Sequence, residues 1–118
     1  MPGASRTDAI GISNTSQIVG YYFSGGTMHG FLLDHGTFTT IDASGASLTQ
    51  AYRINARGEI VGRYVLGGIE HGFLLGHDTL TTIDVPGASL TQAVGISDRG
   101  QIVGVYGAGG TFHGFVLH

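Results

Sequence analysis

The sequence predicts an all-β protein built from three copies of a unit of four short antiparallel strands. The clearest copy contains the segment EIVGRYVLGGIEHGFLL, from Glu59 to Leu75, in which two strand-forming runs flank Gly67-Gly68. Short β-rich runs separated by a glycine pair predict a hairpin. The segment recurs as QIVGYYFSGGTMHGFLL at 17–33 and as QIVGVYGAGGTFHGFVL at 101–117, a period of 42 residues. A regular period of this length indicates a repeat architecture, and the alternation of apolar and polar residues has the period of strands rather than of helices.

The composition agrees with one compact repeat domain over residues 1–118 and argues against two classes of partner. Of the 118 residues 42% are hydrophobic, 11% are charged and 22 are glycine, which is typical of a turn-rich β protein and not of a disordered chain. The net charge is −3 and the five basic residues, all arginine, form no cluster in the sequence, so we expect no nucleic-acid partner. No apolar run approaches the roughly 18 residues of a membrane-spanning helix, so we expect no membrane partner.

Two further features bear on chemistry and location. The chain has no cysteine, which excludes disulfides and thiolate metal sites within it. Met1-Pro2-Gly3 does not have the pattern of a signal peptide. The composition therefore predicts a soluble chain and leaves its location unknown.

Taken in order, the three units cover residues 4–45, 46–87 and 88–118. Each opens with a strand, followed by a polar turn and then by the hairpin. A fourth strand, rich in threonine and isoleucine, is expected in the first two units only, because the third unit stops at His118. The expected first strands are TDAIGIS from Thr7, TQAYRIN from Thr49 and TQAVGIS from Thr91, and the expected fourth strands are FTTID from Phe38 and LTTID from Leu80.

Four strands in about 42 residues is the size of one β-propeller blade. Small residues such as Ala51 and Ala93 in the first strand of each unit suit the crowded axis of a propeller. Three blades do not close a ring, for which 4–8 are typical, and an open half would leave two apolar faces bare. We therefore predict a homodimer that completes one six-bladed ring. The alternative is a β-trefoil, which would close as a monomer but lacks here a twelfth strand and the tryptophan of the Gln-x-Trp motif.

The repeat resembles a known family. The pattern TTIDVPGAS, TQAVGIS, GQIVG and HGFVL, read from Thr81 through Leu117, is similar to the bacterial HAF repeats, which are described as probable extracellular repeats. The resemblance covers nearly the whole chain and implies a propeller-like architecture and an extracellular origin. Two features depart from the family, the shortness of the chain and Tyr52-Arg53. The family implies no catalytic residues.

Three histidines recur at the repeat period and are candidate metal ligands for zinc or a similar ion. Imidazole is a common metal ligand and a general base near neutral pH. A third strand, however, lies about 10 Å from the first strand of its blade, so histidines on separate blades would not converge. The competing interpretation is that each histidine closes its own hairpin by bonding to the backbone. These residues are His29, His71 and His113, and a second repeated pair, His35 and His77, is expected in solvated turns.

The beginnings of the three first strands provide a second candidate site. Asp8, Gln50 and Gln92 are equivalent positions, and a closed ring would bring six such side chains around its axis. Oxygen ligands in this arrangement suit a divalent ion such as calcium or magnesium. The alternative is a polar, solvated channel mouth.

Tyr52 and Arg53 break the repeat most clearly, since the first unit has Ile10-Gly11 and the third has Val94-Gly95 at these positions. Residues that break a local rule often mark function, so Tyr52 and Arg53 are the candidate catalytic residues, with Arg53 binding an anionic group. The competing interpretation is drift at a solvent-facing position.

Two functions follow as expectations. One is a metal-dependent hydrolase of ester or phosphoester substrates with a site on the axis of the oligomeric propeller, in which a divalent metal activates water and a small molecule is bound. The other is a non-catalytic module that binds a glycan or a protein.

Asp42 and Asp84, which end the fourth strands, are expected to cap turns.

Overall fold

The computed structural model describes residues 4–118, and these form eleven β-strands and no helix, so the all-β prediction is confirmed. Every strand that the repeat predicts is present, within a residue or two of the expected bounds. All eleven belong to one mixed, open sheet. The strands are β1 (Arg6–Ile12), β2 (Ile18–Ser24), β3 (Thr27–Asp34), β4 (Thr37–Ile41), β5 (Leu48–Ile54), β6 (Ile60–Leu66), β7 (Ile69–Gly76), β8 (Thr79–Ile83), β9 (Leu90–Ile96), β10 (Ile102–Ala108) and β11 (Thr111–Leu117).

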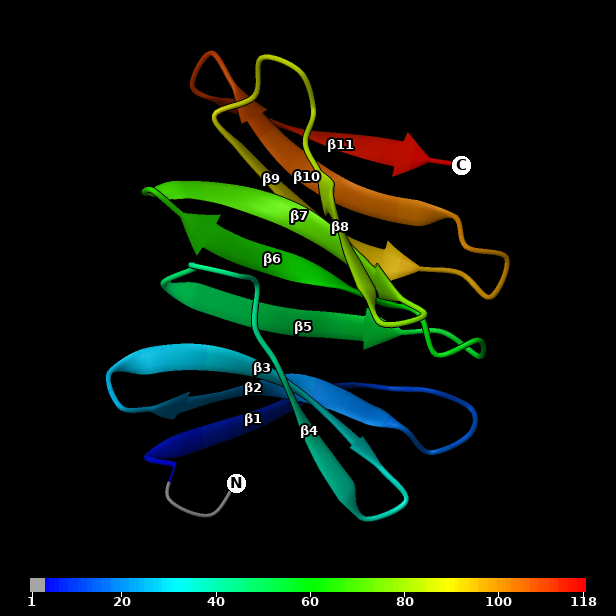
Figure 1. The fold of residues 1–118 in the computed structure, drawn as a ribbon. Helices are drawn as coiled ribbons and strands as arrows, with labels where there is room; N and C mark the ends of the chain where they lie inside the picture. The colour runs from blue at the N-terminus through cyan, green and yellow to red at the C-terminus, as the bar shows by residue number, and fades with distance from the viewer. Residues whose placement is uncertain (1–3) are drawn as a thin grey trace.

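The strands divide into the three predicted units (Figure 1). In unit one, β1, β2, β3 and β4 pair antiparallel in sequence order, and β5 to β8 repeat this arrangement in unit two. Unit three consists of β9, β10 and β11. Only one parallel pair connects each unit to the next, Met28 with Leu48 and Glu70 with Leu90. The units are therefore antiparallel meanders that touch mainly through their faces.

The central hairpin of each unit turns on its glycine pair, as the sequence predicts. In unit two, φ is +61° at Gly67 and +78° at Gly68. Two successive residues with positive φ are required by the tight turn that matches the twist of antiparallel strands, and glycine adopts this conformation without a steric penalty.

The first strand of each unit carries one β-bulge, which the sequence did not predict. In unit two, Ala51 pairs with Gly62 and Arg53 pairs with Val61, so Tyr52 is the additional residue. Ile10 and Val94 occupy the same place in the other units. A bulge bends the strand and redirects side chains, so the repeat-breaking Tyr52 lies at a position where the backbone is already irregular.

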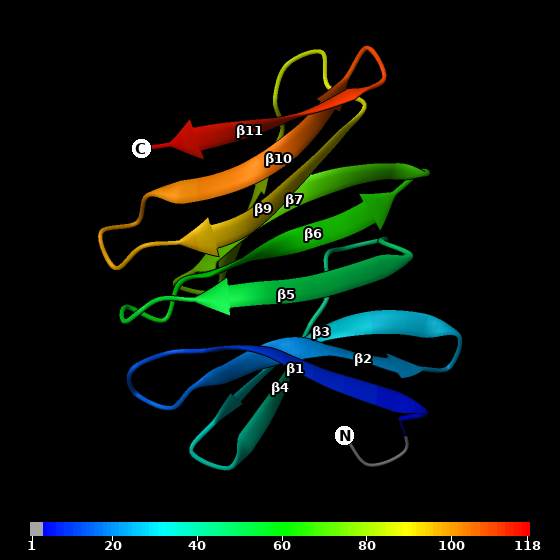
Figure 2. The ribbon, with the colours of Figure 1, turned by 180° about the vertical axis from the view of Figure 1, so that it is seen from behind.

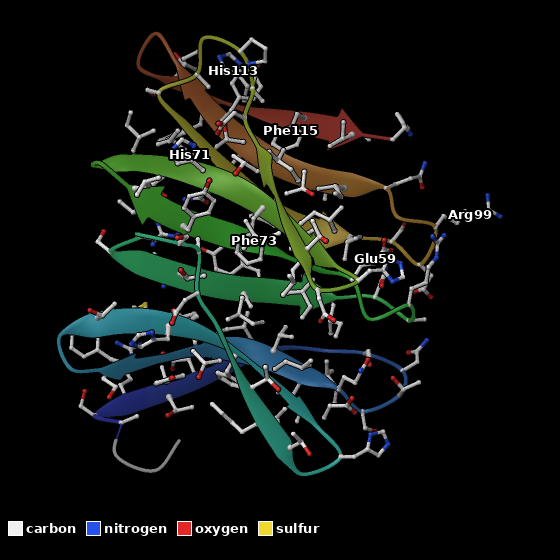
Figure 3. The ribbon with its side chains drawn as sticks, in the orientation of Figure 1. Glu59, His71, Phe73, Arg99, His113 and Phe115 are labelled. Atoms are coloured by element: carbon white, nitrogen blue, oxygen red, sulfur yellow. The ribbon has the colours of Figure 1, made fainter. Side chains whose placement is uncertain are left out.

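The core lies between the units. Phe73 is fully buried at the junction of units one and two (Figure 3), packed with Ala51 and Tyr64 of its own unit and with Val19 and Ile41 of unit one. Close packing explains the glycine opposite it, because a Cβ at Gly62 would lie 2.8 Å from the Phe73 ring.

The three units lie one after another, with unit two in the middle, and equivalent residues differ in exposure according to whether their unit lies in the middle or at an end. Ile54 of unit two is 6% exposed, whereas Ile12 of unit one is 66% exposed. On the opposite face, Val61 of unit two is fully buried and Val103 of unit three is 45% exposed. Unit two is therefore covered on both faces, and units one and three each leave one apolar face open.

The first strands of the three units, β1, β5 and β9, lie next to one another on one side of the molecule (Figure 2), with β4 and β8 on the other side (Figure 1). The sheet remains open from β1 to β11, whereas the alternative β-trefoil would close as a monomer. The part of the chain that the structure describes contains no helix long and apolar enough to cross a membrane.

Candidate functional site

A group of hydrogen-bonded polar side chains is centred on unit two and extends to one residue, Gln92, of unit three. Its centre is an ion pair between Arg63 in β6 and Glu70 in β7. We call this group the unit-two polar cluster, and its members are Gln50, Tyr52, Arg63, Glu70 and Gln92.

The cluster forms a continuous chain of hydrogen bonds from β5 to β9. The Tyr52 hydroxyl and Arg63 Nε both donate to Gln50 Oε1, at 2.8 and 2.7 Å. Arg63 Nη1 donates to Glu70 Oε1, and the same oxygen accepts from Gln92 Nε2 at 2.7 Å. Because β5, β6 and β7 belong to unit two and β9 to unit three, the cluster bridges two units.

The environment shifts two pKa values in this cluster. Burial raises the pKa of the Tyr52 hydroxyl above its ordinary value, and the nearby Arg63 only partly opposes this. Burial would also raise the pKa of Glu70, but the hydrogen bonds from Gln92 and Arg63 and the charge of Arg63 outweigh it and hold this pKa below its ordinary value. Tyr52 is therefore a neutral hydrogen-bonding group at neutral pH, and Glu70 is a carboxylate.

The cluster remains accessible from solvent. The side chains of Arg63 and Glu70 are 21% and 25% exposed. Gln50 is buried and donates from its Nε2 to the sulfur of Met28. Within residues 4–118 no buried side-chain nitrogen or oxygen lacks a hydrogen-bond partner, so cluster atoms without a protein partner, such as Gln92 Oε1, face water. The cluster therefore presents polar groups, already held by hydrogen bonds, to solvent.

Sequence reasoning missed Arg63 and Glu70, although the repeat contains their signal. The position of Arg63 is Tyr21 in unit one, and the position of Glu70 is Met28. Unit three has Val105 and Phe112 there. The comparison of sister positions that singled out Tyr52 would have found both charged residues.

The other candidates from the first strands of the units, Asp8 and Arg53, do not join the cluster. Asp8 accepts a hydrogen bond from Arg6 Nε at 2.8 Å in unit one, and no bond connects it to Gln50 or Gln92. Arg53 Nη1 donates to the carbonyl oxygens of Tyr52 and Ile10, at 2.7 and 3.4 Å. Tyr52 and Arg53 thus belong to different surroundings, and Arg53 connects unit two to the backbone of unit one.

The repeated histidines lie apart, each inside its own unit. His71 Nδ1 lies 2.8 Å from Asp84 Oδ1, and its ring stacks on Tyr64. His29 in unit one has an equivalent contact at 2.8 Å, with Asp42. The partner of His29 and of His71 is a carboxylate, whereas the competing interpretation had given the backbone as partner, and the two aspartates bind histidine instead of capping turns. The pairs connect the third strand to the end of the fourth.

His113 stacks on Tyr106 in the same way, but no carboxylate lies beside it in the described structure. His35 is an exposed turn residue with φ of +49°, and its Nδ1 lies 2.5 Å from Asp34 Oδ1. Hydrogen bonds from Gln17 and then from His35 lower the pKa of Asp34. His77 also occupies a turn, with φ of +51°.

No three or more His, Asp or Glu side chains among residues 4–118 gather in a way that could hold a metal ion. Comparison with models of protein families, with curated proteins and with solved structures found no match.

Proposed function

We propose that this protein is a non-catalytic binding module whose ligand is a neutral, hydroxyl-rich molecule such as a glycan. The observation that carries the proposal is the unit-two polar cluster. Its charged members lie in one unit of an otherwise regular repeat, and each of them replaces an apolar or aromatic residue of the sister units. Packing of identical units does not require such a cluster.

The chemistry of the cluster favours hydroxyl groups over ions. The charges of Arg63 and Glu70 compensate each other, which disfavours a strongly charged ligand. Guanidinium, carboxylate, amide and phenol groups lie within one hydrogen-bond chain and offer both donors and acceptors. A sugar hydroxyl both donates and accepts, so it can bond to such a surface without leaving a polar group unpaired.

The repeat provides a sharp test. The double variant Arg63→Tyr, Glu70→Met gives unit two the residues of unit one at both positions. Binding would be screened on a glycan array and then quantified by calorimetry with the strongest glycan. We expect at least a tenfold loss of affinity in the double variant, which corresponds to about 1.4 kcal/mol. Circular dichroism should show an unchanged fold.

The matched control is Arg53→Gly, which also introduces the residue of both sister units but lies outside the cluster. This variant should bind as the native protein does. Equal binding by the double variant, or an array without any signal, would contradict the proposal.

We also propose that a second copy completes a six-bladed ring. The exposed face of unit one carries Ile10 and Ile12, and that of unit three carries Val103, Phe112 and Val116. Inside the chain, the equivalent faces pack against each other and bury Ile54 and Val61. A second copy can repeat this contact at both junctions, which supports a closed dimer over an exposed apolar surface.

Light scattering on a sizing column tests the ring. The expected mass is twice the 12.2 kDa of one chain. A mass near 12.2 kDa at about 100 μM, where a stable dimer should form, would rule out the closed ring.

The metal-dependent hydrolase remains a prediction. Its proposed residues are separated, because Tyr52 belongs to the cluster and Arg53 does not. Metal analysis after gentle purification, together with an ester and phosphoester panel with and without chelator, tests it. Chelator-sensitive turnover would favour the hydrolase over the binding module.

A further inference from the structure

The outer edge of β11 differs from the same edge in the other two units. β3 pairs along its second half with β4, and β7 pairs in the same way with β8. Within residues 4–118, β11 pairs with β10 alone. An unpaired strand edge presents a row of backbone donors and acceptors to which another strand can add.

Two side chains of each complete unit hold the fourth strand. In unit two, the Tyr64 hydroxyl bonds to Thr82 Oγ1 at 2.5 Å, and His71 bonds to Asp84 at 2.8 Å. Unit one repeats both contacts, each at 2.8 Å, between Tyr22 and Thr40 and between His29 and Asp42. The tyrosine and histidine are stacked neighbours in both units.

Unit three has the same tyrosine and histidine in the same arrangement. The rings of Tyr106 and His113 are 5.1 Å apart at an angle of 28°, compared with 5.0 Å and 27° for Tyr64 and His71. Neither Tyr106 nor His113 has a hydrogen-bonded side-chain partner in the described part of the chain. Tyr106 and His113 therefore already have the arrangement that holds the fourth strand in units one and two, so little ordering would oppose the binding of a strand.

The backbone also leaves room for a strand. In unit two a Cβ added at Gly72 would lie 3.2 Å from the carbonyl oxygen of Ile83 in β8, so glycine permits this close approach. At Gly114 of β11, by contrast, the nearest atom to an added Cβ would be the carbonyl oxygen of Gly104 in the paired strand β10, at 3.8 Å. Phe115 is only partly buried, whereas the equivalent Phe73 is fully buried. The view with side chains shows Phe115 and His113 near this edge (Figure 3).

We propose that the outer edge of β11 is a binding site for an extended segment of another polypeptide chain with the sequence pattern Thr-apolar-Thr-Thr-Ile-Asp. The register follows from β4 and β8. The segment runs antiparallel to β11, with its isoleucine opposite Gly114 and its last threonine opposite Phe115. Its aspartate reaches His113, and its last threonine reaches the Tyr106 hydroxyl. This is strand addition, in which backbone bonds give affinity and alternate side chains give specificity. The inference is independent of the glycan proposal.

The binding experiment uses a labelled peptide with the sequence of residues 77–87, HDTLTTIDVPG. Fluorescence anisotropy measures its binding to the full chain. We expect saturable binding with Kd below about 1 mM, the weak end of specific recognition. Gly114→Val should abolish binding, because its side chain occupies the space that the peptide isoleucine carbonyl needs. The space now around Gly114 is open, so this variant should fold, as circular dichroism would show.

A double-mutant cycle tests the specific contact without any change in the core. The peptide with Asp84→Asn should bind the native protein about three- to tenfold more weakly, because a charge-assisted hydrogen bond to His113 is lost. Against the His113→Gln protein the two peptides should bind equally. A peptide with Ile83→Asn should bind much more weakly than either.

Four results would overturn the proposal. The first three are the absence of saturation up to about 1 mM, equal binding to the native and Gly114→Val proteins, and no coupling between the peptide aspartate and His113. The fourth is self-association of the protein that Gly114→Val prevents and with which the peptide does not compete, because this edge would then be assigned to a second copy.

Discussion

Valine at positions 19, 61 and 103 provides the most direct test of how the units are arranged. The three residues are equivalent in the repeat and identical in chemistry. Val19 and Val61 are fully buried against the following unit, whereas Val103 is 45% exposed. Substitution of each by alanine removes the same two carbon atoms, so any difference in stability reports the surroundings.

The expected magnitudes follow from burial. Removing two buried carbons costs about 1.6 kcal/mol of transfer free energy, and the residual cavity raises the loss to about 2–3 kcal/mol at Val19 and Val61. At Val103 about half of the transfer term applies and no closed cavity forms. The loss for Val103→Ala in a single chain should therefore stay below about 1 kcal/mol.

Urea denaturation followed by circular dichroism measures these losses. With a dependence of about 1.5 kcal/mol per molar urea, the difference between Val61→Ala and Val103→Ala is roughly 1 M in the midpoint. The series should be run at low and high protein concentration. If a second copy closes the ring, the loss at Val103 should grow as concentration rises. Equal losses at all three positions in the most dilute samples would show that the face of unit three around Val103 is already covered within a single chain. That result would refute the arrangement in which this face is exposed.

Three further predictions concern single side chains. Glu70→Gln should weaken the loss of stability at acid pH. The pKa of Glu70 is lowered in the native protein, so the carboxylate stabilises the fold above its ordinary pKa of about 4.5, and this stabilisation is lost as pH falls through the lower native value. Thermal melts of both proteins between pH 3 and 6 would show the difference. Gly62→Ala places a Cβ 1.9 Å from the Gln50 carbonyl oxygen and should cost at least about 3 kcal/mol in urea denaturation, whereas Gly76→Ala, whose nearest neighbour would be 3.7 Å away, should change stability by less than about 0.5 kcal/mol. In urea denaturation His71→Ala should cost about 1 kcal/mol more than His113→Ala, since His71 has a carboxylate partner and His113 has none among the described residues. Equal losses would contradict this.

The repeat period accounts for most of what the sequence predicted correctly. A glycine pair with positive φ and runs of β-branched residues act locally, so strand positions such as β6 and β7 follow from a short window of sequence. The partner of His71 cannot be read from such a window, because Asp84 directly follows another strand, β8, and reaches the ring only through the register of β7 with β8. The sequence nevertheless contains a signal for it: His and Asp recur 13 residues apart in units one and two.

The sequence could not predict where the side chains of Tyr52 and Arg53 point, for a different reason. Adjacent residues in a regular strand point to opposite faces, but Tyr52 is the additional residue of a bulge. The bulge places the Tyr52 hydroxyl on Gln50, while Arg53 reaches the backbone of Ile10. A small change of backbone geometry therefore separates two residues that the sequence had assigned to one site.

The ion pair of unit two supplies a last prediction that separates function from stability. Arg63 and Glu70 occupy positions that are Tyr and Met in unit one, and their side chains are only 21% and 25% exposed. The removal of two charges from water opposes folding, and well-packed apolar residues often replace such a pair without loss. We therefore expect the double variant Arg63→Tyr, Glu70→Met to unfold within about 1 kcal/mol of the native protein, or to be more stable, while either single change leaves one charge unpaired and costs more. Urea denaturation of the three variants gives the comparison. A double variant much less stable than both single variants would mean that the pair is structural, and the cluster would then need no ligand to explain it.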